Sequence, residues 1–169
     1  CHLRDLLDSV MRVFASQAGN AGLELQLKVA EDLPEKVHTD PDRLRQILNN
    51  LLGNALKFTQ QGSVTLHAAP AAQQTDLLRF DVQDTGVGIP ASQQQHIFER
   101  FSQADAPASS KLQGTGLGLS ICKRLTQMLG GEIWVTSEKG KGSVFSFTIT
   151  APTVMGHEPP QGRPVAQQE

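Results

Sequence analysis

Apolar and polar positions along the chain follow two different periods. Apolar residues at intervals of three and four predict helices, which are expected at 3–18, from about 41, at 91–98 and at 117–129. Alternation of apolar and polar residues, or a short apolar run, predicts strands, which are expected at 22–29, 63–69, 77–82, 132–136 and 143–150. The pattern therefore predicts about four helices and five strands, with a hairpin at the end.

Short polar signals mark the ends of several of these elements. Asp40 or Asp42 can cap the second helix, and Pro41 suits its first turn. Ser92 is a possible cap for the short third helix. The pair Gly130-Gly131 is a strong signal for the end of the last helix.

Proline, glycine and glutamine dominate the chain from residue 152 onward, and no apolar period survives there. Such a composition cannot bury enough apolar surface to fold. We therefore expect one domain at 1–151, followed by a disordered linker or tail at 152–169. With 169 residues, of which 38% are hydrophobic, the chain is long enough for one packed core.

Charge and cysteine content exclude several function classes. A net charge of -2 gives no reason to expect nucleic acid or an anionic membrane as a partner. Cys1 and Cys122 form no disulfide framework, so we expect a cytoplasmic setting whether or not the parent protein is anchored in a membrane. The sequence has no apolar run of membrane-spanning length and no signal peptide. Because the chain opens with Cys rather than Met, we expect it to be a piece of a longer protein.

Two carboxamides lie one turn apart on the second predicted helix. Asn50 and Asn54 are followed by Lys57, and residues three and four apart share a helix face. Amide oxygens suit a hard cation such as Mg²⁺, and a lysine suits a phosphate. A helix with solvated Asn side chains is the alternative, which these residues alone do not exclude.

A glycine-rich turn follows the predicted strand at 77–82. It reads Asp84-Thr85-Gly86-Val87-Gly88-Ile89-Pro90. The glycines let the backbone turn sharply and approach a ligand closely. The Asp84 carboxylate can accept a hydrogen bond from an exocyclic amine such as that of adenine. An ordinary Asp-Gly turn is the alternative.

A second glycine-rich segment opens the last predicted helix. It reads Gln113-Gly114-Thr115-Gly116-Leu117-Gly118-Leu119. Exposed amides at a helix N-terminus bind phosphate oxygens. Two commoner phosphate motifs are excluded, because the chain has no G-x-x-x-x-G-K-[ST] and because Leu119 and Ile121 stand where the dinucleotide-binding spacing requires Gly. A flexible loop is the alternative.

Arg100 lies between two aromatic residues, in the run Phe98-Glu99-Arg100-Phe101. Its guanidinium could reach a terminal phosphate bidentately. The two Phe residues could hinge the polar segment 102–115 as a moving lid. A surface arginine between two core aromatics is the alternative.

The order of these four clusters resembles the N, G1, F and G2 boxes of the ATP-binding catalytic domain of sensor histidine kinases. The resemblance runs from about Leu3 to Thr150. The run Phe101-Ser102-Gln103-Ala104-Asp105 and the linker-like tail look like hybrid kinases, in which a receiver domain follows. The family implies the Bergerat fold of the α+β class. That fold is a two-layer α/β sandwich, in which a mixed, mostly antiparallel sheet of about five strands has helices on one face and a flexible ATP lid.

By this resemblance the first glycine-rich turn would bind the base of ATP. Asp84 would accept the adenine amine, and Gly86 and Gly88 would leave room for the base. Three apolar side chains would wall the ring: Phe58, Ile89 and Leu119.

The resemblance assigns the other clusters to the metal and the phosphates. Asn54 and Asn50 would hold Mg²⁺, Lys57 would bind the phosphates, and Arg100 would act on the transferring phosphoryl group. The phosphate chain would lie on the start of the last helix, at Gly114, Thr115, Gly116, Leu117 and Gly118, where Thr115 is expected to act as a helix cap. Gln113 departs from the many relatives that have Gly there, and could alter nucleotide affinity.

The family transfers the γ-phosphoryl group to a histidine. Such a transfer needs positioning and charge neutralisation more than covalent help from the protein. In related ATPases such as gyrase, a Glu stands at the position of Asn50 and activates water. An amide cannot serve as that base, which favours transfer to a side chain over hydrolysis.

The acceptor histidine is not expected within this chain. None of the five histidines is followed by the family's Glu-x-x-Thr-Pro pattern, and His96 is expected to be a partly exposed helix residue. The expected partners are ATP, the upstream dimerisation and phosphoacceptor helices of a homodimeric parent, and a receiver domain or response regulator. Two other functions stay open: an ATP hydrolase or protein-serine kinase of the same fold, and a docking module without kinase activity.

Overall fold

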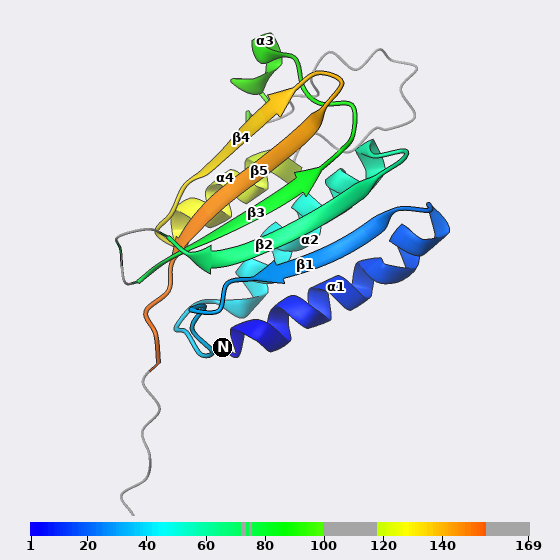
Figure 1. The fold of residues 1–169 in the computed structure, drawn as a ribbon. Coiled ribbons are helices and arrows are strands. Elements are labelled where there is room, and N and C mark those ends of the chain that lie inside the picture. Colours follow the sequence, from blue (N-terminus) through cyan, green and yellow to red (C-terminus); the bar gives the residue numbers. More distant parts are fainter. Residues whose placement is uncertain (72–73, 75, 100–117, 155–169) are drawn as a thin grey trace, which may run out of the picture.

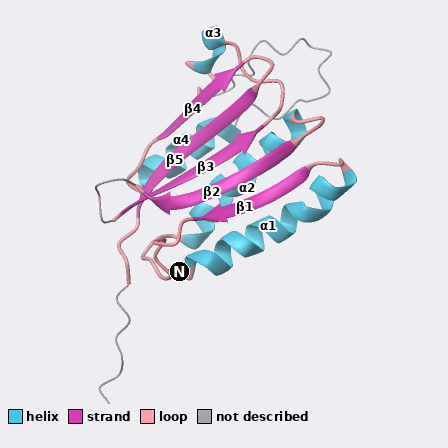
Figure 2. Cartoon of the chain, in the orientation of Figure 1, coloured by secondary structure: helices cyan, strands magenta, loops and turns pink. Residues whose placement is uncertain are grey.

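The computed structural model describes residues 1–71, 74, 76–99 and 118–154. Figures 1 and 2 show one sheet with helices on one side of it. The elements in chain order are α1 (Leu3–Asn20), β1 (Glu24–Val29), α2 (Pro41–Phe58), β2 (Ser63–Pro70), β3 (Leu77–Asp84), α3 (Ala91–Gln94), α4 (Gly118–Met128), β4 (Ile133–Glu138) and β5 (Gly142–Thr150).

The five strands form one mixed sheet in the order β1-β2-β3-β5-β4. Only the β1–β2 pair is parallel, and the other three neighbouring pairs are antiparallel. The predicted closing hairpin is β4–β5, in which Gly140 of the turn and Gly142 at the start of β5 have φ +87° and +108°. The predicted α+β class, with a mixed and mostly antiparallel sheet, is therefore confirmed.

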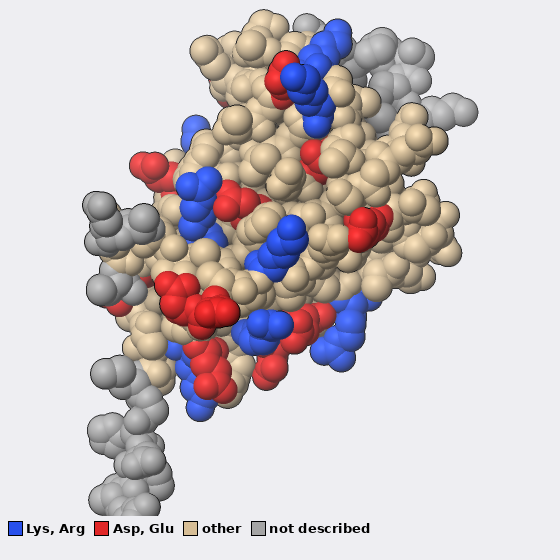
Figure 3. Space-filling model, in the orientation of Figure 1, with Lys and Arg blue, Asp and Glu red and all other residues tan. Residues whose placement is uncertain are grey.

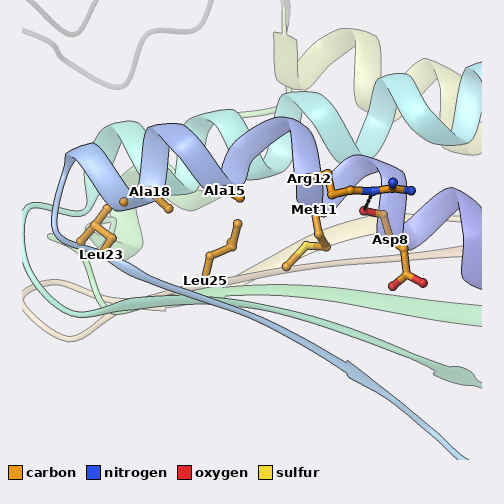
Figure 4. A pocket seen from close by; sticks show the side chains of 8 residues that line it. Asp8, Met11, Arg12, Ala15, Ala18, Leu23 and Leu25 are labelled. Carbon is orange, nitrogen blue, oxygen red and sulfur yellow. Dashed lines mark hydrogen bonds between the residues drawn. The ribbon is translucent and has the colours of Figure 1, made fainter.

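The core lies between the sheet and the helices. Successive side chains of a strand point to opposite faces, so every second residue of β3 faces the helices, and Leu78, Phe80 and Val82 are buried there. The Phe80 and Phe147 rings stack with centroids 5.0 Å apart. The apolar stripe of α2 that faces the core is buried along its length: Leu44, Ile47, Leu48, Leu51, Leu52, Ala55 and Leu56. Figure 4 shows α1, α2 and α4 on the same side of the strands, which is the predicted two-layer sandwich.

The opposite face of the sheet carries polar side chains, and none of the described helices packs on it (Figure 1). One row crosses all five strands in register, through Lys28, His67, Asp81, Ser146 and Trp134. The Ser146 hydroxyl donates to the Asp81 carboxylate, which also pairs with a nearby guanidinium on the same strand. Figure 3 shows that acidic and basic side chains are interspersed on this side of the molecule, so no field of a single sign marks it as a surface for nucleic acid.

Several boundaries differ from the sequence-based predictions for local reasons. The helix predicted at 91–98 ends at Gln94. Its N-cap residue Pro90 makes no side-chain cap, so nothing offsets the cost of forming the first helical turn. Ser92, predicted as its cap, is instead inside that turn. The strand predicted to end at residue 82 continues to Asp84, which pairs with both neighbouring strands.

The end of the described chain is held to the fold beyond the predicted domain boundary. The His38 amide donates to the Pro152 carbonyl, and the Val154 amide donates to the Lys36 carbonyl. Residues 152–154 are thus tied to the segment before α2, although we assigned them to the linker. The linker itself stays a prediction, since 155–169 lie outside the described residues.

Candidate functional site

The site begins on α2, whose start is fixed by its sequence. The Asp40 carboxylate accepts from the amides of Asp42 and Arg43, which is the predicted cap. From there the helix runs unbroken through Asn50, Asn54 and Lys57. All three side chains are half-buried, beside the buried stripe rather than opposite it. The predicted alignment of two amides and one ammonium on a helix is therefore present.

Asp84 is the last residue of β3 and faces the helices, in phase with the buried Phe80 and Val82. It is 7% exposed. Its carboxylate accepts from the Gly86 amide at 2.9 Å and from the Ser143 amide. Burial raises the pKa of Asp84, while these two backbone hydrogen bonds act in the opposite direction. A carboxylate at the edge of the core is thus held in place by backbone donors.

The C-terminal end of α2 meets the turn after Asp84. A Cβ on Gly86 would lie 2.5 Å from the Phe58 carbonyl oxygen, 3.0 Å from Thr59 Oγ1 and 3.1 Å from Asp84 Oδ1. Only glycine fits there without displacing the backbone. The C-terminal end of α2, the helix that carries Asn54, therefore lies at the same corner of the molecule as the Asp84 carboxylate.

Gly88 is the second place in this turn where glycine is required. It has φ +70°, and a Cβ would lie 2.1 Å from the Glu138 carbonyl oxygen at the β4–β5 turn. The close approach leaves Ile89 half-buried against the core. Because the turn is confined between α2 and the β4–β5 hairpin, its shape is set by both.

The start of α4 lies next to the amide-bearing face of α2. Gly118 is its first residue, and a Cβ there would meet no atom within 4 Å. One turn later, the buried Cys122 thiol is hydrogen-bonded by the Asn50 side chain and lies 3.9 Å from the Ile47 carbonyl oxygen. Burial raises the pKa of Cys122 to about 12, so the thiol stays protonated. Its place in the core gives this cysteine a structural role.

Five predicted site residues lie outside the described part of the chain: Arg100, Gly114, Thr115, Gly116 and Leu117. Gln113 and the predicted lid lie outside it as well, and their roles stay predictions. Of the two hinge aromatics, Phe98 is described, and its ring meets Phe145 edge-on at 6.2 Å. Two of the residues predicted to wall the adenine ring take different positions. Leu119 packs against the core, whereas Phe58 is 38% exposed and its ring centroid lies 5.6 Å from Lys57 Nζ.

The structure adds polar residues that sequence reasoning missed. Thr59 is buried, with its hydroxyl donating to the Ala55 carbonyl at 2.7 Å, directly beside Gly86. Ser143 is paired with Asp84 on the neighbouring strand β5, and Ser137 is paired with Ser143 one strand further on, in β4. For Ser143 the only sequence signal was a polar residue at the start of a predicted strand, and Ser137 lay one residue beyond the strand predicted at 132–136.

A separate groove of about 660 Å³ lies between α1 and β1 (Figure 4). Its wall is mainly apolar, with Met11, Ala15, Ala18 and Leu25 among the lining residues, and Asp8 and Arg12 at one end. None of its lining residues is a predicted site residue. The groove is therefore distinct from the corner between α2 and β3.

Within the described ranges, no group of three or more His, Cys, Asp or Glu side chains could hold a metal ion. His96 is exposed, as expected, and its Nδ1 lies 3.0 Å from Glu99 Oε1, but it follows α3 and is not within a helix. No helix in the described part of the chain has the length and apolarity to cross a membrane.

Comparison with known proteins identifies the family. Residues 39–153 match the histidine kinase-, DNA gyrase B- and HSP90-like ATPase family. The chain belongs to that family. The match begins just before α2 and ends after β5, so all the described site residues of this ATPase domain lie within it.

Individual relatives agree with this family. The chain is 47% identical over 141 residues to the aerobic respiration control sensor protein ArcB of Escherichia coli (strain K12), which covers 83% of the chain but 18% of ArcB. Full-length ShkA, solved in complex with AMPPNP, is 36% identical with a TM-score of 0.81 over 92% of this chain and 31% of ShkA. Histidine kinase ThkA, in complex with response regulator protein TrrA, is 27% identical with a TM-score of 0.70, covering 89% of this chain and 40% of that one. The ATPase domain thus spans about a fifth of the length of ArcB.

Proposed function

We propose that the chain binds Mg-ATP in the corner between the end of α2 and the Asp84–Pro90 turn. The observation that carries this proposal is the close approach at Gly86, where a Cβ would collide with the Phe58 carbonyl and crowd Asp84. Because glycine lets the turn pack directly on the end of α2, the buried Asp84 carboxylate is held at a fixed position beside that helix end. The carboxylate of Asp84 would accept the exocyclic amine of adenine.

The donor set also fits a magnesium ion. Mg²⁺ prefers oxygen ligands and keeps several of its waters, so one or two amide oxygens with phosphate oxygens suffice. Asn54 and Asn50 would supply these, and bound Mg²⁺ neutralises charge on the phosphate groups.

Charge on the phosphate chain would be met by side chains and by a helix end. Lys57 is within the last turn of α2 and would approach the phosphates. The segment from Gly114 to Gly118 leads into the N-terminus of α4, where the amides and the helix dipole favour an anion. Arg100 would neutralise charge that develops on the transferring group.

The reaction we propose is transfer of the γ-phosphoryl group to a histidine on a separate dimerisation helix, as part of two-component signal transduction. Asn50 stands where a catalytic base would be needed for hydrolysis, and an amide cannot take up the proton of water. The likeness to a kinase solved with a response regulator supports a receiver domain or response regulator as the final acceptor. The parent protein would be a homodimeric hybrid sensor kinase, with this domain in the cytoplasm.

The test restores the upstream segment of the parent protein and adds labelled ATP with Mg²⁺. The expected product is phosphate on protein that is labile in acid and stable in base, as a phosphohistidine is. The matched variant Asp84→Asn should greatly reduce the labelling. Label that is stable in acid would point to a serine kinase instead, and release of free phosphate without labelled protein would point to a hydrolase.

A further inference from the structure

The face of the sheet that packs against the helices changes from apolar to polar side chains at one end. Its rows are apolar through the middle of the sheet, as in the row that joins Phe80, Phe147 and Ile133. The last row is different, because Asp84, Ser143 and Ser137 follow one another across β3, β5 and β4. Three polar side chains in register mark the point where the core ends and the proposed base pocket begins.

The Ser137 hydroxyl joins three backbone segments. It accepts from the Ile89 amide at 2.7 Å, donates to the Gly142 carbonyl at 2.9 Å and lies 2.7 Å from Ser143 Oγ. A hydroxyl has one proton to donate and can accept twice. With its proton on Gly142, Ser137 must accept from Ser143, so all of its hydrogen-bonding positions are used.

The same row connects to the carboxylate of the proposed site. The Ser143 amide donates to the Asp84 carboxylate, while the Ser143 hydroxyl donates to Ser137. Ser137 in turn holds the amide of Ile89, at the far end of the turn that starts at Asp84. The two ends of the turn are therefore tied to each other through two serines.

One further side chain holds the same point of the turn. The Gln94 amide nitrogen donates to the Ile89 carbonyl and to the Ser137 carbonyl, both at 2.8 Å. Both polar backbone atoms of Ile89 thus depend on side chains, one from β4 and one from α3. Neither side chain is among the residues proposed to touch the nucleotide.

We propose that Ser137 is a positioning residue for nucleotide binding, which holds Ile89 and Asp84 at the spacing that a purine requires. This inference rests on the proposed function, because it concerns the same pocket. Removing the hydroxyl leaves the Ile89 amide and the Ser143 hydroxyl without their partner, so the turn is free to leave the position that walls the base. The loss should appear in nucleotide affinity and in local protection of the Ile89 amide, rather than in the transfer step.

The test compares four forms of the full chain: wild type, Ser137→Ala, Ser137→Thr and Thr136→Ala. Thr136 is the exposed neighbour on β4 and serves as the matched loss of a hydroxyl on the other face of the strand. Calorimetry measures the Kd for AMPPNP with Mg²⁺, and hydrogen exchange measures the Ile89 amide. We expect Ser137→Ala to raise the Kd about five- to thirtyfold and to speed exchange at Ile89. Ser137→Thr should restore both, and Thr136→Ala should change neither.

An unchanged Kd in folded Ser137→Ala overturns the inference. This holds even if the thermal stability of the variant falls, because loss of a purely structural serine would lower stability without changing the Kd. If Ser137→Ala does not fold, Gln94→Met decides, since it removes the second tie to Ile89 and must raise the Kd as well. Failure of wild type to bind AMPPNP would instead refute the proposed function. In that case the exchange at Ile89 would still report whether Ser137 holds the turn.

Discussion

Replacing Asp84 by Asn separates recognition of the base from stability of the fold. The carboxylate has two oxygens and already accepts from the Gly86 and Ser143 amides. An Asn side chain has one acceptor oxygen and one NH₂ group, so it cannot serve both amides and also accept the adenine amine. One donor must then face another donor, which is the interaction that the substitution tests.

The expected loss follows from the type of hydrogen bond. A hydrogen bond to a charged group in a buried site contributes about 1.5–3 kcal/mol. Asp84→Asn should therefore weaken ADP or AMPPNP binding by roughly ten- to a hundredfold. Asp81→Asn is the matched control, because it makes the same chemical change three residues away, on the face of the sheet that no helix covers.

The free energy of unfolding should depend on pH through the titration of Asp84. Burial raises the pKa of Asp84 in the folded chain above its unfolded value. The unfolded chain therefore loses this proton first as pH rises. The stability contributed by protonated Asp84 is fully present below the unfolded pKa and is lost as pH rises through the folded pKa. Asn does not titrate, so this part of the pH dependence of the free energy of unfolding should be absent from Asp84→Asn.

Calorimetry gives the affinity, and urea unfolding at several pH values gives the stability. Equal affinity of wild type and Asp84→Asn for ADP would remove Asp84 from the site. Equal losses of affinity in Asp84→Asn and Asp81→Asn would show that the effect is one of overall charge. An unchanged pH dependence of stability in Asp84→Asn would refute our account of why the pKa is raised.

Three further substitutions test other parts of the account. Asn54→Ala should weaken nucleotide binding when Mg²⁺ is present and have little effect in chelator, whereas an equal loss in both conditions would exclude a metal role. Gly88→Ala should destabilise the fold by more than Gly22→Ala. Both glycines have φ near +70°, where a non-Gly residue alone costs about 1–2 kcal/mol, but of the two only Gly88 would place a Cβ against backbone, 2.1 Å from the Glu138 carbonyl oxygen. Similar melting temperatures for the two variants would contradict this collision. Asp40→Ala should lower the free energy of unfolding by about 1 kcal/mol through loss of the α2 cap, and Asp42→Ala, which removes no cap, should cost less in the same urea titration.

Much of the architecture could be predicted because its signals are local. The apolar stripe of α2, the Asp40 cap and the alternation along β3 each lie within one element, where period and capping decide the outcome. The same is true of Asn50 and Asn54, whose spacing places them on one helix face in any context. Order along the chain then identified the family, although no single cluster could.

The remaining features depend on contacts between distant segments. Ser137 and Asp84 are 53 positions apart in the chain, and only the register of β3, β5 and β4 places them in one row. The approach of the Phe58 carbonyl to Gly86 depends on how α2 packs against the sheet. Neither fact is encoded in a local period, so the supporting residues of the site could not be predicted as its motif residues were.

A crystal structure of the full chain with AMPPNP and Mg²⁺ tests the central claim most directly. The account predicts that the exocyclic amine of the purine donates to the Asp84 carboxylate, and that the amide oxygen of Asn54 lies about 2.0–2.1 Å from the metal ion. A purine bound elsewhere, for example in the groove between α1 and β1, would contradict it. So would a purine beside Asp84 with the metal ion held by neither Asn50 nor Asn54.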